Sequence, residues 1–175
     1  MVLPKLTLIL GGAASGKSSF AESLVLKGGD GDPIYIATAQ VFDNEMAEKV
    51  AKHRAMRGTG WRTIEEPLYL ADALAKVDAN QPVLIDCATL WLTNVILGEH
   101  GTEAQSVALM AALERCKGPV VIVSNEVGQG IVPENKLSRT FRNAQGRLNQ
   151  EIATKSDLVV AVMAGLPLAL KGQLP

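Results

Sequence analysis

Five short apolar runs recur along the chain, and most of their positions are apolar without a regular polar alternation. They are rich in Val, Ile and Leu and cover residues 5–11, 33–39, 82–87, 119–125 and 157–165. Continuous apolar runs of this length are typical of strands that are buried on both faces of a parallel sheet. The pattern therefore predicts five strands in the interior of the molecule.

Helical patterns lie between these apolar runs. The predicted helices cover residues 16–27, 43–56, 67–78, 102–116 and 136–155. The last of them has a single apolar stripe, formed by Leu137, Phe141, Ala144, Leu148 and Ile152. Alternating strands and helices predict an α/β fold, with a mostly parallel central sheet flanked by helices and right-handed crossovers. A length of 175 residues fits one domain spanning 1–175.

Composition and charge narrow the classes of function. The chain is 47% hydrophobic and 20% charged, which is ordinary for a soluble globular protein. Its formal net charge of −1 provides no basic field for nucleic acid, and no apolar run reaches transmembrane length. The first ten residues lack the charged and apolar order of a signal peptide. We therefore expect a cytoplasmic protein that binds neither nucleic acid nor a membrane.

Two cysteines, Cys87 and Cys116, fit this expectation. Cys87 ends an apolar run and Cys116 ends a predicted helix. A disulfide is not expected in a reducing compartment, and the two positions lack the spacing of a metal site.

The stretch "GGAASGKS", residues 11–18, directly follows the first predicted strand. It fits the pattern G-x-x-x-x-G-K-[ST], in which glycines let backbone N–H groups turn towards phosphate oxygens. The following helix points its positive end at the same anion. Lys17 is expected to reach the β and γ phosphates and Ser18 to ligate Mg²⁺. The alternative is a glycine-rich turn that merely closes a strand–helix unit, and Lys17 argues against it.

Asp86 ends the third apolar run, "PVLIDC". An acid at the carboxyl end of a buried strand is where P-loop proteins hold or orient Mg²⁺. The alternative is that Asp86 caps the segment that follows. The two interpretations are compatible.

Polar residues also follow two other predicted strands. Thr38 comes after the second, and Asn125 and Glu126 come after "VVIVS". Strand carboxyl ends line the ligand crevice of open α/β sheets, so these residues are placed to meet a substrate. Ordinary loop capping is an equally good interpretation of each one alone.

His53 can be interpreted in two ways. It shares a stripe of the 43–56 helix with Met46 and Val50, which favours a partly buried helix histidine. Its immediate surroundings are basic, with Lys52, Arg54 and Arg57. Such a cluster suits phosphates better than a core, and a neutral imidazole there could attack phosphorus.

Three arginines of the last helix lie off its apolar stripe: Arg139, Arg142 and Arg147. They form either a solvated charged face or a phosphate clamp near the crevice. His100, in "GEHGTE", is expected on the surface.

Taken together, these segments resemble a known family, the bifunctional adenosylcobinamide kinase/adenosylcobinamide-phosphate guanylyltransferases of cobalamin biosynthesis. The similar blocks follow in order along nearly the whole chain. They are "GGAASGKS", "YIATAQVFDNEM", the His and Arg of "KHRAMRG", "WRTIEEP", "LIDCATLWLTN", "VSNEVGQGIVPENKLSRTFRNAQGRLNQ" and "AGLPLALKG". The stretch "NEVGQGIVPEN" is the most specific, because generic P-loop kinases lack it.

The resemblance implies a RecA-like P-loop NTPase fold, a homotrimer and two reactions. The first phosphorylates the aminopropanol hydroxyl of adenosylcobinamide, with ATP or GTP as donor. The second transfers GMP from GTP onto that phosphate through a guanylylated histidine, whose position His53 matches. Mg²⁺ is the implied cofactor, held by Ser18 and Asp86.

The same resemblance implies a set of site residues. Lys17 joins His53 as catalytic. The implied nucleotide-binding residues are Gly11, Gly12, Ala13, Ala14, Ser15, Gly16, Lys17, Ser18, Ala37, Thr38, Ala39, Arg54, Ala55, Met56, Arg57, Glu65 and Asp86. Ala14 departs from the family, which usually has Arg there, and this removes a charge near the phosphates. Two other functions fit the P-loop alone, namely a small-molecule kinase without transferase activity and a non-enzymatic GTP switch.

Overall fold

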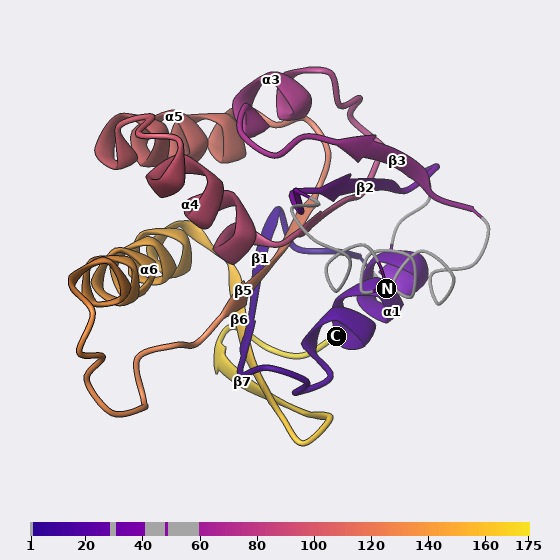
Figure 1. The fold of residues 1–175 in the computed structure, drawn as a ribbon. Coiled ribbons are helices and arrows are strands. Elements are labelled where there is room, and N and C mark those ends of the chain that lie inside the picture. Colours follow the sequence, from indigo (N-terminus) through magenta and orange to yellow (C-terminus); the bar gives the residue numbers. More distant parts are fainter. Residues whose placement is uncertain (1, 29–30, 41–47, 49–59) are drawn as a thin grey trace.

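The centre of the molecule is a seven-stranded sheet with helices on both sides (Figure 1). The computed structural model describes residues 2–28, 31–40, 48 and 60–175. The strands follow the order β3-β2-β4-β5-β1-β6-β7 across the sheet. Their bounds are β1 (Leu6–Gly11), β2 (Ile34–Ala37), β3 (Arg62–Glu65), β4 (Val83–Asp86), β5 (Val120–Asn125), β6 (Leu158–Met163) and β7 (Leu166–Lys171).

Every neighbouring pair is parallel except β6 and β7, so the prediction of a mostly parallel sheet is confirmed. The five apolar runs form β1, β2, β4, β5 and β6. The two strands that the pattern missed, β3 and β7, are the edge strands. Most of their residues are exposed, so they lack the continuous apolar run of an interior strand.

The helices agree with the sequence in most places. They are α1 (Lys17–Gly28), α3 (Leu70–Ala75), α4 (Ala88–Leu97), α5 (Thr102–Arg115) and α6 (Lys136–Lys155). The last of these has the predicted bounds, whereas the helix predicted over 67–78 is shorter. The pattern missed α4. The helix predicted over 43–56 lies outside the described residues, apart from Glu48.

Two apolar layers hold the helices to the sheet. Figure 1 shows α3, α4, α5 and α6 on one side of the sheet and α1 on the other. Successive strand residues face opposite layers, so Leu8 packs into the first layer and Ile9 into the second. Full burial of one such side chain contributes roughly 1.5–3 kcal/mol to folding. The strands are therefore fixed in register, and with them the positions of their carboxyl ends.

The apolar stripe of α6 is correct for most of its length. Leu148 and Ile152 are buried, and Phe141 and Ala144 pack against the same core. Leu137 is instead 51% exposed, because the first turn of α6 extends beyond that core. Within the described ranges, none of the helices has an apolar stretch long enough to span a bilayer.

Candidate nucleotide-binding site

The predicted site residues that the structure describes lie at or next to the carboxyl edge of the sheet. In the strand register Gly11 lies opposite Asn125, and Ala37 lies between Glu65 on one side and Asp86 on the other. Four parallel strands, β1, β2, β4 and β5, therefore end side by side. This edge is where open α/β sheets bind ligands.

The loop between β1 and α1 forms a tight turn. The N–H of Ser15 donates to the carbonyl of Gly12 (3.3 Å), and that of Phe20 donates to the carbonyl of Gly16 (3.0 Å). Ala14 (φ 55°) and Gly16 (φ 91°) both adopt the left-handed region. Left-handed residues in such a turn point successive N–H groups into one concavity, which is how a P-loop holds an anion.

Lys17 begins α1 and lies over this turn. Its ammonium group donates to the carbonyl oxygen of Gly12 (2.9 Å). The Lys17 side chain is half-buried, as is that of the neighbouring Ser18. The lysine charge and the N-terminus of a 12-residue helix thus act on the same small volume.

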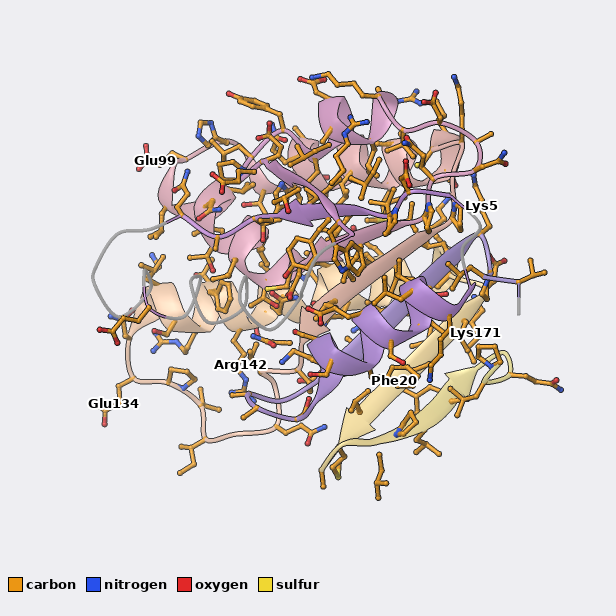
Figure 2. All side chains as sticks on the ribbon, turned by 90° about the vertical axis from the view of Figure 1, so that its right-hand side faces the viewer. Lys5, Phe20, Glu99, Glu134, Arg142 and Lys171 are labelled. Atoms are coloured by element: carbon orange, nitrogen blue, oxygen red, sulfur yellow. The ribbon has the colours of Figure 1, made fainter. Side chains whose placement is uncertain are left out.

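The turn between β6 and β7 supports the loop from behind. The N–H of Gly165 donates to the carbonyl of Ser15 (2.8 Å). A Cβ atom on Gly16 would lie 3.1 Å from the Cα of Gly165, and one on Gly11 would lie 2.7 Å from the carbonyl oxygen of Val162. Figure 2 shows the β6–β7 hairpin alongside α1. The loop is therefore packed against a segment about 150 residues away along the chain, which the motif did not reveal.

Asp86 does not cap α4. The Sγ atom of Cys87 accepts the capping hydrogen bond from the N–H of Leu90 (3.5 Å). The Asp86 carboxylate instead accepts a hydrogen bond from the Tyr35 hydroxyl through Oδ2 (2.8 Å). Its Oδ1 has no hydrogen-bond partner in the part of the chain that the structure describes. The carboxylate therefore remains available to the site.

The charges of Lys17 and Asp86 both act on the buried Cys87 thiol, in opposite directions. The pKa of the Cys87 thiol is raised from 9.0 to about 11, first by burial and then by the negative charge of Asp86, while the charge of Lys17 opposes the shift. Lys17 follows β1 and Asp86 ends β4, so both charges belong to the carboxyl edge of the sheet.

The described residues could supply two oxygen ligands to Mg²⁺ but no larger set of protein ligands. Among the described residues, no three His, Cys, Asp or Glu side chains form a group that could hold a metal ion. Magnesium in nucleotide sites is held by one or two protein oxygens, waters and the phosphates themselves. The Ser18 hydroxyl and the second oxygen of Asp86 are such protein oxygens.

Thr38 is fully buried, and its hydroxyl bonds to the backbone of Cys87. It donates to the Cys87 carbonyl (2.8 Å) and accepts from the Cys87 N–H (2.8 Å). The Asn94 amide donates to the Thr38 carbonyl (2.8 Å). Thr38 therefore joins the ends of β2 and β4, which matches the capping interpretation of this residue. A contact with nucleotide stays a prediction for Thr38 and for its partly buried neighbours Ala37 and Ala39.

Asn125 and Glu126 flank the P-loop. The N–H of Glu126 donates to the carbonyl of Gly11 (3.1 Å), and the N–H of Asn125 donates to the Thr89 hydroxyl (2.8 Å). The Glu126 carboxylate accepts a hydrogen bond from the N–H of Gly128. The end of β5 is thus tied both to the P-loop and to α4.

Two of the three α6 arginines hold the loop between β5 and α6. Arg142 donates to the carbonyl of Gly128, and Arg139 donates to the carbonyls of Pro133 (3.0 Å) and Glu134. Figure 2 labels Arg142 and, on the outer part of this loop, Glu134. Both guanidinium groups therefore brace the loop. Arg147 is exposed, and His100 is exposed as expected.

For the remaining predicted residues a role in the site stays a prediction. Glu65 is exposed at the carboxyl end of β3, opposite Ala37 in the register. His53, Arg54, Ala55, Met56 and Arg57 lie outside the described residues, so their roles stay predictions. Tyr35 and Gly165 lie within two of the blocks that resemble the family, "YIATAQVFDNEM" and "AGLPLALKG", but neither residue was assigned a role of its own from the sequence.

Comparison with known proteins identifies relatives along nearly the whole chain. The family model "Cobinamide kinase / cobinamide phosphate guanyltransferase" matches residues 7–170. The "Bifunctional adenosylcobalamin biosynthesis protein CobP" of Pseudomonas aeruginosa is 46% identical over 95% of this chain and 97% of its own length. Proteins named CobU share 38% identity in Escherichia coli and 41% in Salmonella typhimurium. Each match covers 94% of this chain and 98% of the relative.

Solved structures of much lower sequence identity share the fold. The flagellar accessory protein FlaH from Methanocaldococcus jannaschii is 12% identical, with a TM-score of 0.52 over 98% of this chain and 80% of its own. A solved ATPase domain is 14% identical, with a TM-score of 0.51 over 90% of this chain and 69% of its own. These likenesses confirm the expected P-loop, RecA-like fold.

Proposed function

This chain belongs to the cobinamide kinase / cobinamide phosphate guanyltransferase family, and on that premise we propose that it catalyses both reactions as one catalytic domain of residues 1–175. It first phosphorylates the aminopropanol hydroxyl of adenosylcobinamide, with ATP or GTP as donor. It then transfers GMP from GTP to that phosphate to give adenosylcobinamide-GDP. The observation that carries the proposal is the P-loop turn under Lys17, which lies at the same carboxyl edge of the sheet as Asp86.

The kinase half relies on positioning and charge. Phosphoryl transfer spreads negative charge over the equatorial oxygens of the moving group, and fixed cations and N–H groups stabilise that charge. The turn from Gly12 to Gly16 supplies the N–H groups and Lys17 supplies the cation. Mg²⁺, when bound by Ser18 and Asp86, would neutralise further phosphate charge.

Asp86→Asn tests the metal assignment. The amide keeps the size of the side chain and loses its charge, so we expect turnover to require a higher Mg²⁺ concentration. Turnover measured against Mg²⁺ concentration gives the comparison, and removal of Mg²⁺ with EDTA should stop both reactions in the unmodified protein. An Asp86→Asn variant with an unchanged Mg²⁺ requirement would show that Asp86 does not serve the metal.

The transferase half assigns His53 as the nucleophile. A neutral imidazole nitrogen attacks the α-phosphorus of GTP, the bond to the bridging oxygen breaks, and pyrophosphate leaves with the electron pair. The substrate phosphate then displaces the imidazole and takes the GMP unit. Support comes from the family membership and from the basic residues beside His53 in the sequence, Lys52, Arg54 and Arg57.

Incubation with α-labelled GTP, followed by measurement of the intact protein mass, tests this assignment. We expect the mass to increase by one GMP unit through a bond that is stable in alkali and labile in acid, as a phosphoramidate is. His53→Asn should lose both labelling and transferase activity and keep most kinase activity. The matched control is His100→Asn at the second of the two histidines, which should still label.

Two other results would replace the proposal. Kinase turnover without any labelling would favour a small-molecule kinase that lacks transferase activity. Slow GTP hydrolysis without transfer to any acceptor, together with a change of shape that depends on the γ-phosphate, would favour a GTP switch.

The proposal extends to assembly and location. We expect a homotrimer, as the family resemblance implies, working in the cytoplasm where both nucleotides are available. Support for self-association comes from β7, an edge strand on which Leu166, Leu168 and Leu170 are 72%, 64% and 58% exposed. These leucines alternate along the strand and so share one face.

A further inference from the structure

We propose that Tyr35 is a positioning residue for the nucleotide-bound metal, whose hydroxyl holds the Asp86 carboxylate in the orientation that the metal requires. This inference rests on the metal assignment of the proposed function and names a residue outside its ligands. Three observations carry it: the place of Tyr35 in the sheet, the single proton of its hydroxyl, and the contact of its ring with Trp61.

Tyr35 and Asp86 lie on neighbouring strands and on the same face of the sheet. Strand β2 pairs with β4, and Tyr35 lies opposite Leu84 in the register. Tyr35 and Leu84 both pack into the apolar layer that α1 covers, and Asp86, two residues after Leu84, projects to that side too. Two residues of a strand rise about 7 Å, so the Tyr35 side chain leans along the sheet towards its carboxyl edge. Its hydroxyl meets the Asp86 Oδ2 there (2.8 Å).

The Tyr35 hydroxyl is a group that packing alone does not require. The side chain is 3% exposed and belongs to the apolar core. A phenylalanine ring has the same shape without a polar atom, and a buried tyrosine hydroxyl needs a hydrogen-bond partner. The hydroxyl has one proton, and it donates this proton to Asp86. The hydroxyl therefore serves the carboxylate.

This bond fixes one oxygen of Asp86 and leaves the other to the site. A donor on Oδ2 selects one orientation of the carboxylate, so Oδ1, which has no hydrogen-bond partner among the described residues, keeps a defined direction. The backbone just after Asp86 is fixed as well, because the Thr38 hydroxyl bonds to both the N–H and the carbonyl of Cys87. Removing a partner that orients a metal ligand typically costs about 10–100-fold in metal affinity.

Trp61 supports the ring of Tyr35. The two ring centroids lie 5.7 Å apart, and the ring planes are at 89° to one another. This edge-to-face arrangement is one that aromatic pairs favour. Trp61 is partly buried against the same core, directly before β3. The ring of Tyr35 is thus held by Trp61 and its hydroxyl by Asp86, so the side chain has one defined orientation.

Nucleotide titration with and without metal tests the inference without the corrinoid substrate. Calorimetry with the β,γ-imido analogue of GTP, once with saturating Mg²⁺ and once with EDTA, gives two affinities, and their ratio measures the contribution of the metal. We expect Tyr35→Phe to reduce this ratio roughly tenfold or more. The affinity in EDTA should change less than about twofold, because Tyr35 acts only through Asp86.

A double-mutant cycle with Asp86 distinguishes positioning from a separate effect. Asp86→Asn should also reduce the affinity ratio. The double variant Tyr35→Phe/Asp86→Asn should reduce it no further than Asp86→Asn alone does, because the hydroxyl acts through the carboxylate. Turnover measured against Mg²⁺ concentration should show a higher Mg²⁺ requirement in Tyr35→Phe, with little change in kcat at saturating Mg²⁺.

The matched control is Tyr69→Phe at the other of the two tyrosines, which is 52% exposed. It loses the same hydroxyl and should leave both affinities unchanged. Trp61→Ala is a second variant, which keeps the Tyr35 hydroxyl and removes the ring beside it. It should raise the Mg²⁺ requirement in the same direction as Tyr35→Phe does and by less.

The outcomes separate this inference from the proposed function. If Tyr35→Phe lowers thermal stability and leaves the affinity ratio unchanged, the hydroxyl is merely structural and the inference is overturned. Equal losses of affinity with Mg²⁺ and with EDTA would overturn it too, as would a double variant whose loss is the sum of the two single losses. If Asp86→Asn itself leaves the ratio unchanged, the metal assignment of the proposed function fails, and this inference with it.

Discussion

At the scale of single residues, the adjacent Asp86 and Cys87 have opposite surroundings. Asp86 is half-buried, bonds to Tyr35 and lies at the carboxyl edge of the sheet, while Cys87 is buried and caps α4. The strand ends at the first residue and the helix begins after the second. The Asp86 carboxylate is therefore available to the site, whereas the adjacent Cys87 thiol stabilises the start of α4.

Lys17 gives the most direct test at this scale. Lys17→Ala removes the cation that meets the β and γ phosphates, and such contacts typically contribute about 3–4 kcal/mol to a transition state. We expect kinase turnover to fall by two orders of magnitude or more, roughly. Steady-state kinetics and nucleotide titration measure the change. Turnover within about threefold of the unmodified protein, at unchanged nucleotide affinity, would contradict the P-loop assignment.

The raised pKa of the Cys87 thiol predicts that the stability of the fold depends on pH. Its pKa is raised from 9.0 to about 11 in the folded protein, first by burial and then by the charge of Asp86. Between these values the unfolded chain has lost the thiol proton and the folded chain retains it, so stability falls as pH rises. A pKa shift of this size lowers the free energy of unfolding by up to about 3 kcal/mol. The full loss is reached above about pH 11.

Cys87→Ser isolates this contribution, because serine keeps a capping oxygen and does not titrate in this range. Denaturant unfolding at pH 8 and at pH 10.5 or so should show a smaller loss of stability in the variant than in the unmodified protein. Equal losses of stability in the two proteins would mean that the Cys87 thiol does not contribute to the pH dependence.

At the scale of elements, the P-loop and the β6–β7 hairpin form one packed unit. The loop adopts its turn locally, and the hairpin fixes it through the bond from Gly165 to Ser15 and through close contacts at Gly11 and Gly16. Lys171 of β7 also donates to the carbonyls of Ala153 (3.1 Å) and Thr154 (3.0 Å) at the end of α6. The hairpin therefore links the nucleotide loop to the far end of the longest described helix.

Gly16→Ala tests this unit. The φ of Gly16 is 91°, and an added Cβ would lie 3.1 Å from the Cα of Gly165. We expect a loss of about 1–2 kcal/mol in the free energy of unfolding, and weaker nucleotide binding, because the loop must shift. Thermal unfolding and calorimetric titration measure the two effects.

Gly146→Ala is the matched control. Gly146 lies within α6 and an added Cβ meets nothing within 4 Å. Alanine is the better helix former, so this variant should gain about 0.4–1 kcal/mol of stability. A Gly16→Ala variant that gained stability as Gly146→Ala does would contradict the packing described for the loop.

At the scale of the whole molecule, the two edges of the sheet differ. Strand β3 is short and polar at one edge, whereas β7 at the other exposes three leucines on one face. Natural edge strands usually carry charge or are covered, so an exposed apolar edge favours contact with another chain. In the proposed trimer we expect this face to be covered.

Leu168→Glu places a charge in the middle of that face. We expect light scattering to give three chains of 18.5 kDa for the unmodified protein and a smaller assembly for the variant. Val107→Glu, at a 65% exposed position of α5, is the control and should leave the assembly unchanged. An unmodified protein that is monomeric, or a Leu168→Glu variant that assembles normally, would count against this face as the interface.

The sequence by itself determined the features that depend on local chemistry. The P-loop was evident from residues 11–18 between a strand and a helix, because phosphate binding needs small residues and a lysine at fixed spacing. The bounds of α6 followed from its apolar period, and the interior strands followed from continuous apolar runs. Each of these signals lies within about 20 residues, so one pass along the chain finds it.

The tertiary structure alone decided which distant residues meet. Tyr35 bonds to Asp86 across 51 positions, and the P-loop rests on the β6–β7 turn. Thr38, which follows β2 as the sequence predicted, also bonds through its hydroxyl to the backbone of Cys87, 49 positions away. The backbone of Asn125, at the end of β5, is held by the Thr89 hydroxyl of α4 and the Asn149 amide of α6. Such contacts depend on strand order and register, and these follow from packing of the whole sheet rather than from any short motif.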